Sequence, residues 1–526
     1  MTRKLTKSAG LIGAATMSSR VLGMVRDVVQ GAYFGTGIAA DAFAVATRIP
    51  TLLRDLFAEG AMSAAFVPTF TRYLEKGGKP AAWRLGSLVI NALLVATSVL
   101  VVLGILFAGP ITRLYTTAAY QAIPGKLAMT IQLTRVNMPF LLLVAVAAAY
   151  MGMLNAMRRF FVPAMSPTMY NVVFIACTVV FVPVFTAMGV QPVMALSVGM
   201  LLGGVAQIVS QWPAIRGEGY RHRWVLDWKD PGLRAVLTLM GPGSLGVAAA
   251  QVNILVNTLL ATRIEGAPSA LSYAFRLMYM PVGIFGVSIA TAAIPELARQ
   301  AANNSPDQMR GTLSWGMRLM LVVSVPATIG LMVLSTPIIE LIFKRGAFVP
   351  QSVFLVSQSL LYYAPGIVGY SLVKILSPSF YAMRDARTPV IVSVITIITN
   401  LVLNLALVRS LGFQGLALGT AIAANVNAGL LFVLLARRLG GLDTARILGV
   451  LARILAASAA MAVTAYFVEA KLHALLPAEA TPARLLRVFG GIGAGMAVLA
   501  VSAWLLRIEE FRQAVTRALS RFRPRT

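Results

Sequence analysis

The chain of 526 residues has few of the side chains on which metal sites and covalent chemistry depend. It contains one cysteine, Cys177, and two histidines, His222 and His473. One cysteine cannot form an internal disulfide, and these spacings fit no zinc motif. The sequence has no Walker A, G-x-S-x-G or HExxH pattern. We therefore expect a protein that is not an enzyme and that holds no metal or cofactor.

Charged residues are also scarce, at 12% of the chain, whereas 58% of the residues are hydrophobic. The mean hydropathy of +0.79 excludes a soluble protein of this size. The sequence predicts an all-α polytopic membrane protein, because about 14 apolar segments are long enough to cross a hydrocarbon core of roughly 30 Å.

The 18 acids are outnumbered by 45 lysines and arginines, which gives a net charge of +27. In a soluble chain this excess would suggest nucleic acid, but here the basic residues gather between alternate apolar segments, as the positive-inside rule describes. An even number of spans then predicts that both termini are cytoplasmic. Arg20 interrupts the only run that resembles a signal peptide, so we expect the N-terminal segment to be the first span. Contacts of the basic clusters with anionic membrane lipids or cell-wall enzymes remain an alternative role.

An internal repeat runs along the chain. Three pairs of matching motifs are separated by 223 to 227 residues: 156–163 and 382–389 (Ala-Met-Arg-x4-Pro), 65–72 and 292–299, and 189–191 and 412–414. Three matches at nearly one offset indicate a duplication.

The duplication predicts an N-terminal lobe at 1–228, a C-terminal lobe at 229–444, and an extra two-helix hairpin with a basic cytoplasmic tail at 445–526. Each lobe would hold about six spans, so a pseudo-two-fold axis along the membrane normal would relate the lobes, as in transporters that work by alternating access. The hairpin has two open roles, packing or a groove for a lipid tail.

Four arginines lie among apolar residues in the first sixty positions: Arg20, Arg26, Arg48 and Arg54. Each costs about 2.5 to 3.5 kcal/mol at the bilayer centre, so they need a wet cavity or acidic partners. The guanidinium fork fits phosphate oxygens two at a time, which predicts a phosphate or pyrophosphate ligand. Arg276 is the candidate from the second lobe. Buried structural ion pairs are the alternative explanation.

Four acids accompany these arginines in the same two spans: Asp27, Asp41, Asp55 and Glu59. We expect them to pair with the arginines when no ligand is present. Gly23 lies between the first two arginines and Pro50 between the other two. Both residues weaken helices, so we expect helix breaks there that line the cavity.

Three further cations lie in or near predicted spans: Arg135, Lys374 and Arg487. Lys374 is a candidate cavity residue, whereas Arg135 is close enough to an interface to snorkel. Two pairs of asparagines are each spaced four residues apart: Asn253 with Asn257, and Asn400 with Asn404. They are a candidate site for a small cation, and hydrogen bonding between helices is the alternative.

The first 75 residues carry a series of specific motifs: 19–23 (Ser-Arg-Val-Leu-Gly), 26–27 (Arg-Asp), 41–43 (Asp-Ala-Phe), 52–54 (Leu-Leu-Arg), 57–61 (Phe-Ala-Glu-Gly-Ala) and 65–68 (Ala-Phe-Val-Pro). Together with Arg276-Leu277-Met278 and Pro281, they resemble the MurJ, or MviN, family of lipid II flippases.

This resemblance implies a transporter of the multidrug/oligosaccharidyl-lipid/polysaccharide exporter superfamily. It would carry lipid II, the undecaprenyl-pyrophosphate-linked disaccharide-pentapeptide, to the outer leaflet of the bacterial inner membrane for peptidoglycan synthesis. By position, the resemblance implies that Asp41 is a gating acid, that the last two helices form a lipid-tail groove, and that four arginines bind the pyrophosphate and sugar region: Arg20, Arg26, Arg54 and Arg276. Because no nucleotide motif is present, we expect membrane potential or a small ion to drive transport.

The sequence departs from the family at three positions. Asp55 follows Arg54 where many relatives have a second arginine, and Phe275 and Tyr279 stand where many have acids on either side of the second-lobe arginine. The cavity loses charges of both signs, so we expect Arg48 or Lys374 to contribute more here than in relatives.

Four other functions remain open. A flippase for another polyprenyl-pyrophosphate-linked oligosaccharide, of the O-antigen type, would use the same arginines. A cationic-drug exporter would instead favour acids in its cavity. An enzyme acting on polyprenyl-phosphate sugars would need a catalytic acid or metal motif at an interface, and a scaffold for division proteins would make the arginines dispensable.

Overall fold

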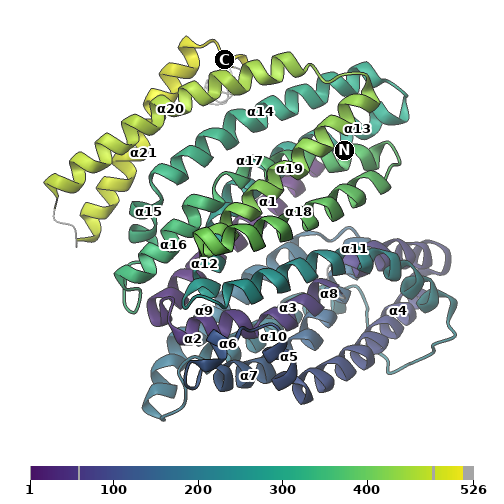
Figure 1. Ribbon diagram of the computed structural model, residues 1–526. Coiled ribbons are helices and arrows are strands. Elements are labelled where there is room, and N and C mark those ends of the chain that lie inside the picture. The colour runs from purple at the N-terminus through teal and green to yellow at the C-terminus, as the bar shows by residue number, and fades with distance from the viewer. Residues whose placement is uncertain (1, 57–59, 477–479, 513–526) are drawn as a thin grey trace. The chain divides into compact units, whose positions relative to one another are not determined.

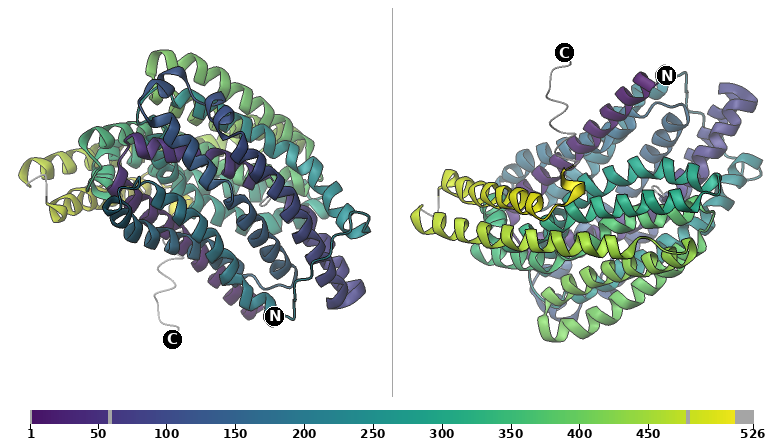
Figure 2. Two further views of the ribbon diagram at one scale, coloured as in Figure 1. Left: turned by 90° about the horizontal axis from the view of Figure 1, so that it is seen from below. Right: turned by 90° about the horizontal axis from the view of Figure 1, so that it is seen from above.

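The computed structural model describes residues 2–56, 60–476 and 480–512, with side chains described outside 2–12, 60–64 and 241–250. These residues form helices, turns and short connections and contain no strand, as Figures 1 and 2 show. The predicted all-α class is therefore confirmed. Helices satisfy their backbone hydrogen bonds internally, which is what a bilayer requires of a chain that crosses it.

The chain forms two compact units, Met1–Ser269 with Arg345–Phe348, and Ala270–Lys344 with Val349–Thr526. The first unit contains α1 (Thr2–Phe34), α2 (Ile38–Ala46), α3 (Arg48–Arg54), α4 (Gly60–Leu106), α5 (Ala108–Leu114), α6 (Ala118–Ala122), α7 (Lys126–Asn137), α8 (Phe140–Ala156), α9 (Phe161–Ala187), α10 (Met194–Gly217), α11 (Pro231–Ala261) and the start of α12 (Ala267–Pro281).

The second unit contains the rest of α12, η2 (Val282–Gly286), α13 (Val287–Ala302), α14 (Pro306–Val333), α15 (Ser335–Phe343), α16 (Pro350–Tyr363), α17 (Gly366–Ala382), α18 (Arg387–Leu411), α19 (Phe413–Leu439), α20 (Thr444–Leu475) and α21 (Thr481–Leu505). Helix α11 packs against α4 in the first unit, although the predicted lobe boundary at 228/229 precedes it. The lobes at 1–228 and 229–444 and the segment 445–526 remain a prediction, because packing does not define a repeat.

Ten helical stretches are long and apolar enough to cross a membrane, or eleven if the bent pair α16 and α17 forms one span, by length and composition among the described residues. Helix α4 covers 47 residues and turns sharply at Gly78, where φ is 66°. At 1.5 Å per residue it would extend about 70 Å, so it supplies two spans rather than one. Helices α1 and α11 are not among these stretches, so the expected number of about 14 spans stays a prediction.

The internal repeat has a local structural counterpart in each unit. Arg158 and Arg384, which occupy equivalent positions of the repeat, both have positive φ, at 60° and 59°. The same three backbone bonds close the two helices: Met157 N to Met153 O, Arg158 N to Asn155 O and Arg159 N to Leu154 O in one, and Met383 N to Ser379 O, Arg384 N to Tyr381 O and Asp385 N to Phe380 O in the other. A non-glycine residue rarely adopts positive φ, so its recurrence supports a duplication.

The predicted C-terminal hairpin is present as α20 and α21, which lie side by side and belong to the second unit (Figures 1 and 2). Gly495 permits the close approach, since a Cβ there would lie 3.2 Å from the Cβ of Ala465. Helix α20 also packs along α14. These contacts describe a packing role for the hairpin, and its predicted lipid-tail groove stays a prediction.

The two expected helix breaks have different outcomes. The break near Pro50 exists, because α2 ends at Ala46, Thr47 separates it from α3, and Pro50 lies in the first turn of α3. The prediction of a break at Gly23 was wrong, because α1 is continuous from Thr2 to Phe34. A single glycine costs a helix only about 1 kcal/mol. The packing of α1 along α9 compensates that cost, and a Cβ at Gly23 would lie 3.7 Å from Asn171 Nδ2 of α9.

Candidate functional site

Arg26 lies on α1 and is held by α9 of the same unit. Its Nε and Nη2 donate to Asp27 Oδ1 at 3.2 and 3.0 Å, and its Nη1 donates to Asn171 Oδ1 at 3.1 Å. The guanidinium also lies 5.6 Å from the ring centre of Phe174 and 5.9 Å from that of Tyr170. Asp27 is 2% exposed. The arginine charge is therefore balanced by a carboxylate, an amide oxygen and two ring faces.

Arg54 ends α3 and forms the second arginine pair of this unit. Its Nε and Nη2 donate to Asp55 Oδ1 at 3.0 and 2.7 Å, and Gln251 Nε2 of α11 donates to Asp55 Oδ2 at 3.0 Å. The side chains of Arg54 and Asp55 remain 29% and 27% exposed. Asp55 thus binds directly to the arginine beside it, and this pair is the more open of the two.

Three further residues were predicted to belong to the site: Arg20, Arg48 and Glu59. Arg20 is partly exposed on α1 and has no ion-pair partner in the described part of the chain. Arg48 is partly exposed at the start of α3. Glu59 lies outside the described residues.

Asp41 contacts a lysine rather than one of the predicted arginines. Lys126 Nζ donates to Asp41 Oδ2 at 2.9 Å, and both side chains are 0% exposed. Gly266 N donates to the same oxygen at 2.7 Å, while the N–H and hydroxyl of Ser269 donate to Oδ1 at 3.1 and 2.7 Å. The carboxylate therefore receives four hydrogen bonds and lies at the N-terminus of α12, where a helix dipole favours a negative charge.

Lys126 is the functional candidate that the sequence interpretation missed. It is the first residue of α7, after Gly125 at φ 75°, and its Nζ lies 4.5 Å from the ring centre of Tyr120. A cation at a helix N-terminus is unfavourable, so Lys126 depends on Asp41 for compensation. The available signal was a lone lysine after a glycine at the start of an apolar segment.

The second unit contains Arg276 and Lys374. Arg276 is exposed on α12. Lys374 is partly exposed on α17, and its Nζ lies 5.8 Å from the ring centre of Tyr279. No acid within the described ranges forms an ion pair with Lys374. A lysine inside a membrane helix without an acidic partner is typical of a ligand path or a water-filled cavity.

Arg487 has a structural role. It is 5% exposed, donates to Glu469 Oε1 at 2.5 and 3.0 Å, and lies 3.7 Å from Glu340. It therefore joins α21 to α20 and α15 within the second unit.

The asparagines do not all lie in one unit. Asn404 Nδ2 donates to Asn400 Oδ1 at 3.0 Å, and Asn400 Nδ2 donates to Thr420 Oγ1 at 3.3 Å, which links α18 to α19. Asn253 and Asn257 lie on α11 in the first unit. The four-residue cation site stays a prediction. The described residues contain no group of three or more His, Cys, Asp and Glu side chains that could hold a metal.

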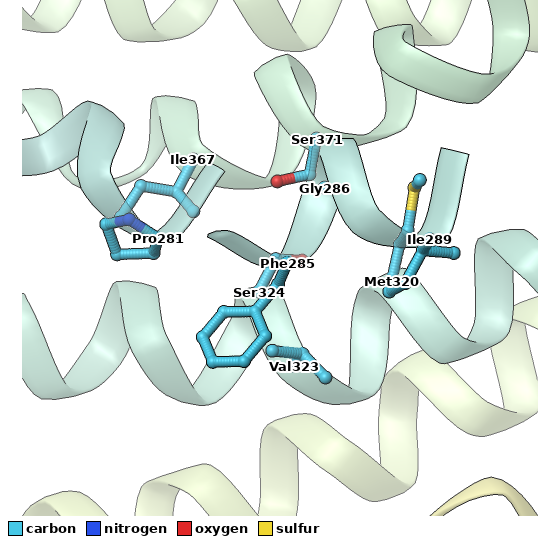
Figure 3. A pocket seen from close by; sticks show the side chains of 9 residues that line it. All are labelled: Pro281, Phe285, Gly286, Ile289, Met320, Val323, Ser324, Ile367 and Ser371. Carbon is cyan, nitrogen blue, oxygen red and sulfur yellow. The ribbon is translucent and has the colours of Figure 1, made fainter. Parts of the chain in front are cut away.

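Two cavities differ greatly in size. The smaller one, about 10 Å³, adjoins η2 in the second unit and has space for about one water (Figure 3). The larger one, about 610 Å³, lies in the first unit and is lined by apolar residues of α3, α4 and α5 and of the neighbouring turns: Ile49, Leu53, Leu100, Leu103, Gly104, Phe107, Pro110, Ile111, Leu114 and Met138. An apolar groove of this volume suits a hydrocarbon chain rather than a charged group.

Membrane-spanning helices, a repeated local structure and intramembrane arginines define the class of this protein as a multi-pass membrane transporter. The fold is similar to that of an inward-facing MATE family transporter of the MOP superfamily, which aligns over 82% of this chain and 99% of its own, with a TM-score of 0.64 at 14% identity.

The chain belongs to the lipid II flippase MurJ family, whose profile matches residues 31–483. A probable lipid II flippase MurJ of Vibrio cholerae is 35% identical over 439 residues, covering 82% of this chain and 83% of the relative. One of Rhizobium meliloti is 33% identical over 499 residues, covering 94% and 92%. A solved structure of lipid II flippase MurJ, in an inward closed conformation, has a TM-score of 0.75 and 25% identity, and covers 94% of this chain and 99% of its own. The protein is thus a multi-pass protein of the inner membrane.

Proposed function

We propose that this protein carries lipid II from the inner to the outer leaflet by alternating access and so supplies precursor for peptidoglycan synthesis. The observation that carries the proposal is the presence of two intramembrane arginines, Arg26 and Arg54, each held by the acid that follows it. Family membership supports lipid II as the ligand.

The arginine pairs suit a pyrophosphate that binds and leaves. In each pair one carboxylate oxygen accepts from Nε and Nη2 of the guanidinium. Phosphate oxygens fit the same fork, so an arriving pyrophosphate can replace the carboxylate. Because Asp27 and Asp55 are adjacent to their arginines in sequence, they stay close and re-form the pair on release. No arginine is then left uncompensated in a low-dielectric interior.

We assign ligand binding to five arginines and ion-pair exchange to three acids: Arg20, Arg26, Arg48, Arg54 and Arg276, and Asp27, Asp55 and Glu59. We assign gating to Asp41, because its four hydrogen bonds fix the start of α12, the helix that continues into the second unit. Movement of α12 against α2 requires these bonds to break.

The proposal includes coupling to membrane potential or a small ion, with both termini cytoplasmic and no catalysis. Contacts with anionic lipids and cell-wall or division proteins complete the predicted partners.

Leaflet accessibility of lipid II tests the function. Cells depleted of this protein receive wild-type, Arg26→Ala or Arg26→Lys copies, and an externally added enzyme cleaves only outward-facing precursor. We expect wild type alone to restore cleavage fully, because lysine cannot copy the bidentate fork. Arg84→Ala is the matched control, since Arg84 is 56% exposed and faces Asp227 and Asp230. Equal membrane abundance of all variants confirms insertion.

Full activity of Arg26→Ala and Arg26→Lys would contradict the assigned arginine site. Unchanged cleavage on depletion would instead favour the second candidate, a flippase for an O-antigen-type polyprenyl-pyrophosphate oligosaccharide, because the same arginines serve any such pyrophosphate.

A further inference from the structure

Four aromatic rings from three helices meet in the second unit, and we call them the aromatic wall: Phe275 and Tyr279 of α12, Tyr363 of α16, and Tyr370 of α17. The rings of Phe275 and Tyr279 stack with centres 5.8 Å apart and planes at 19°. Phe275 meets Tyr363 edge-on at 5.5 Å and Tyr370 at 6.1 Å, and Tyr279 meets Tyr370 at 5.7 Å. These mutual contacts fix the ring planes.

Two rings of the aromatic wall, Phe275 and Tyr279, flank Arg276 in the sequence of α12. Phe275 and Tyr279 lie one helical turn apart, and Arg276 lies three residues before Tyr279, so the arginine and the tyrosine are neighbours on the helix surface. The aromatic wall is therefore built next to the arginine to which we assign pyrophosphate binding.

Polar groups border the aromatic wall. Lys374 Nζ lies 5.8 Å from the ring centre of Tyr279, and the ammonium has no ion-pair partner within the described residues. Among the described residues neither Tyr279 nor Tyr370 makes a side-chain hydrogen bond, and both side chains are partly exposed. A tyrosine in a membrane protein usually satisfies its hydroxyl, so two such hydroxyls and an ammonium are groups that a polar ligand would satisfy.

The combination of ring faces, two hydroxyls and an ammonium favours one kind of ligand group. A phosphate needs cations but gains nothing from ring faces, and a hydrocarbon tail leaves the hydroxyls and the ammonium unsatisfied. A sugar ring suits both, because its C–H face carries positive charge density that complements the negative face of an aromatic ring, while its hydroxyl and carbonyl oxygens accept from Tyr and Lys.

We propose that the aromatic wall binds the sugar part of the transported lipid, with the pyranose next to the pyrophosphate packed on Tyr279 and with Lys374 donating to its oxygens. This inference rests on the proposed function and identifies the aromatic wall as the part of the protein that recognises the sugar headgroup. It assigns a specificity role to four aromatic residues and one lysine, whereas the arginines bind the pyrophosphate that every such lipid shares.

Binding to two probes that differ only in the sugar-peptide headgroup tests the inference. Full-length wild type and variants in lipid nanodiscs are titrated with lipid II and with undecaprenyl pyrophosphate, which has the same tail and pyrophosphate but no sugar. We expect Tyr279→Leu to weaken lipid II binding by about tenfold, as the loss of one well-placed aromatic contact predicts. Binding of undecaprenyl pyrophosphate should stay unchanged.

Two further variants and a control complete the test. Tyr279→Phe keeps the ring and should retain most of the affinity, and Lys374→Met should weaken lipid II binding alone. Tyr381→Leu is the matched control, because Tyr381 is on the same helix as Lys374 but is 53% exposed and outside the aromatic wall.

Equal loss of both probes in Tyr279→Leu would overturn the inference, because it would show a packing defect. Unchanged lipid II binding in Tyr279→Leu would overturn it too, and would leave the proposed function intact. Wild type that binds neither probe would overturn the proposed function and the inference with it.

Discussion

The buried pair of Asp41 and Lys126 makes a sharp stability prediction. Lys126→Met removes the ammonium but keeps an unbranched side chain of similar length. It leaves the carboxylate of Asp41, which is 0% exposed, with three donors, the N–H of Gly266 and the N–H and hydroxyl of Ser269. One negative charge then stays buried without a cation.

The expected cost is about 3 to 5 kcal/mol, because breaking one partner of a buried pair leaves an uncompensated charge. The matched comparison is Lys79→Met. Lys79 Nζ contacts Glu218 at 3.2 Å, a similar distance, but its side chain is 54% exposed. Water screens such a pair, so its loss should cost less than about 1 kcal/mol. The two substitutions are chemically identical, and only burial separates them.

Thermal unfolding of the purified full chain in one detergent measures both variants. We expect a large decrease in the melting temperature for Lys126→Met and almost none for Lys79→Met. Adding Asp41→Asn to Lys126→Met should recover part of the loss, because the neutral amide needs no cation. Equal melting temperatures for the two lysine variants, or no recovery in the double variant, would refute the account of Asp41 as an acid stabilised by Lys126.

Three other outcomes are expected. Asp55→Asn removes the carboxylate that holds Arg54, so binding of undecaprenyl pyrophosphate should tighten by several-fold, and unchanged affinity would show that Arg54 does not bind it. Gly78, at φ 66° and ψ −173° within α4, has a backbone conformation that is essentially restricted to glycine, so Gly78→Ala should cost about 1 to 3 kcal/mol in thermal unfolding. Hydrogen bonds from the backbone N–H and the hydroxyl of Thr388 hold the pKa of Asp385, in the turn between α17 and α18, below its ordinary value of 3.8. Its stabilising effect is therefore present above pH 3.8 and lost as the pH falls through the lower folded pKa, so wild type and Asp385→Asn should differ in melting temperature at neutral pH and converge in acid.

Local and compositional features of this protein follow directly from its sequence. Hydropathy and segment length predict helices because a continuous apolar run of about 20 residues can cross a bilayer as a helix, which satisfies its own backbone hydrogen bonds. The repeat is visible in the sequence as matching motifs. Its structural counterpart depends only on nearby residues, because Arg158 and Arg384 adopt the same positive φ and form the same backbone hydrogen bonds with the preceding helical turn. The pairs Arg26–Asp27 and Arg54–Asp55 also join neighbouring residues.

Other features depend on contacts between residues far apart in the chain. Asp41 and Lys126 are separated by 85 residues, and Arg26 and Asn171 by 145. Periodicity places each side chain on one face of its helix but does not say which helix packs there. For this reason Asp41 was expected to pair with an arginine, and Gly23 was expected to break a helix that its packing on α9 keeps continuous.

The aromatic wall likewise has features that depend on residue type and features that depend on helix packing. The sequence by itself determined that two aromatic residues, Phe275 and Tyr279, lie near Arg276, because this is a matter of residue type at known positions. That these rings meet Tyr363 and Tyr370 and contact Lys374 was decided by the packing of α12 against α16 and α17. The sequence therefore determined the membrane class, the duplication and the inventory of charges, since these depend on composition and local geometry. The tertiary structure decided the partner of each charge and the surroundings of each ring, since these depend on which helices pack together.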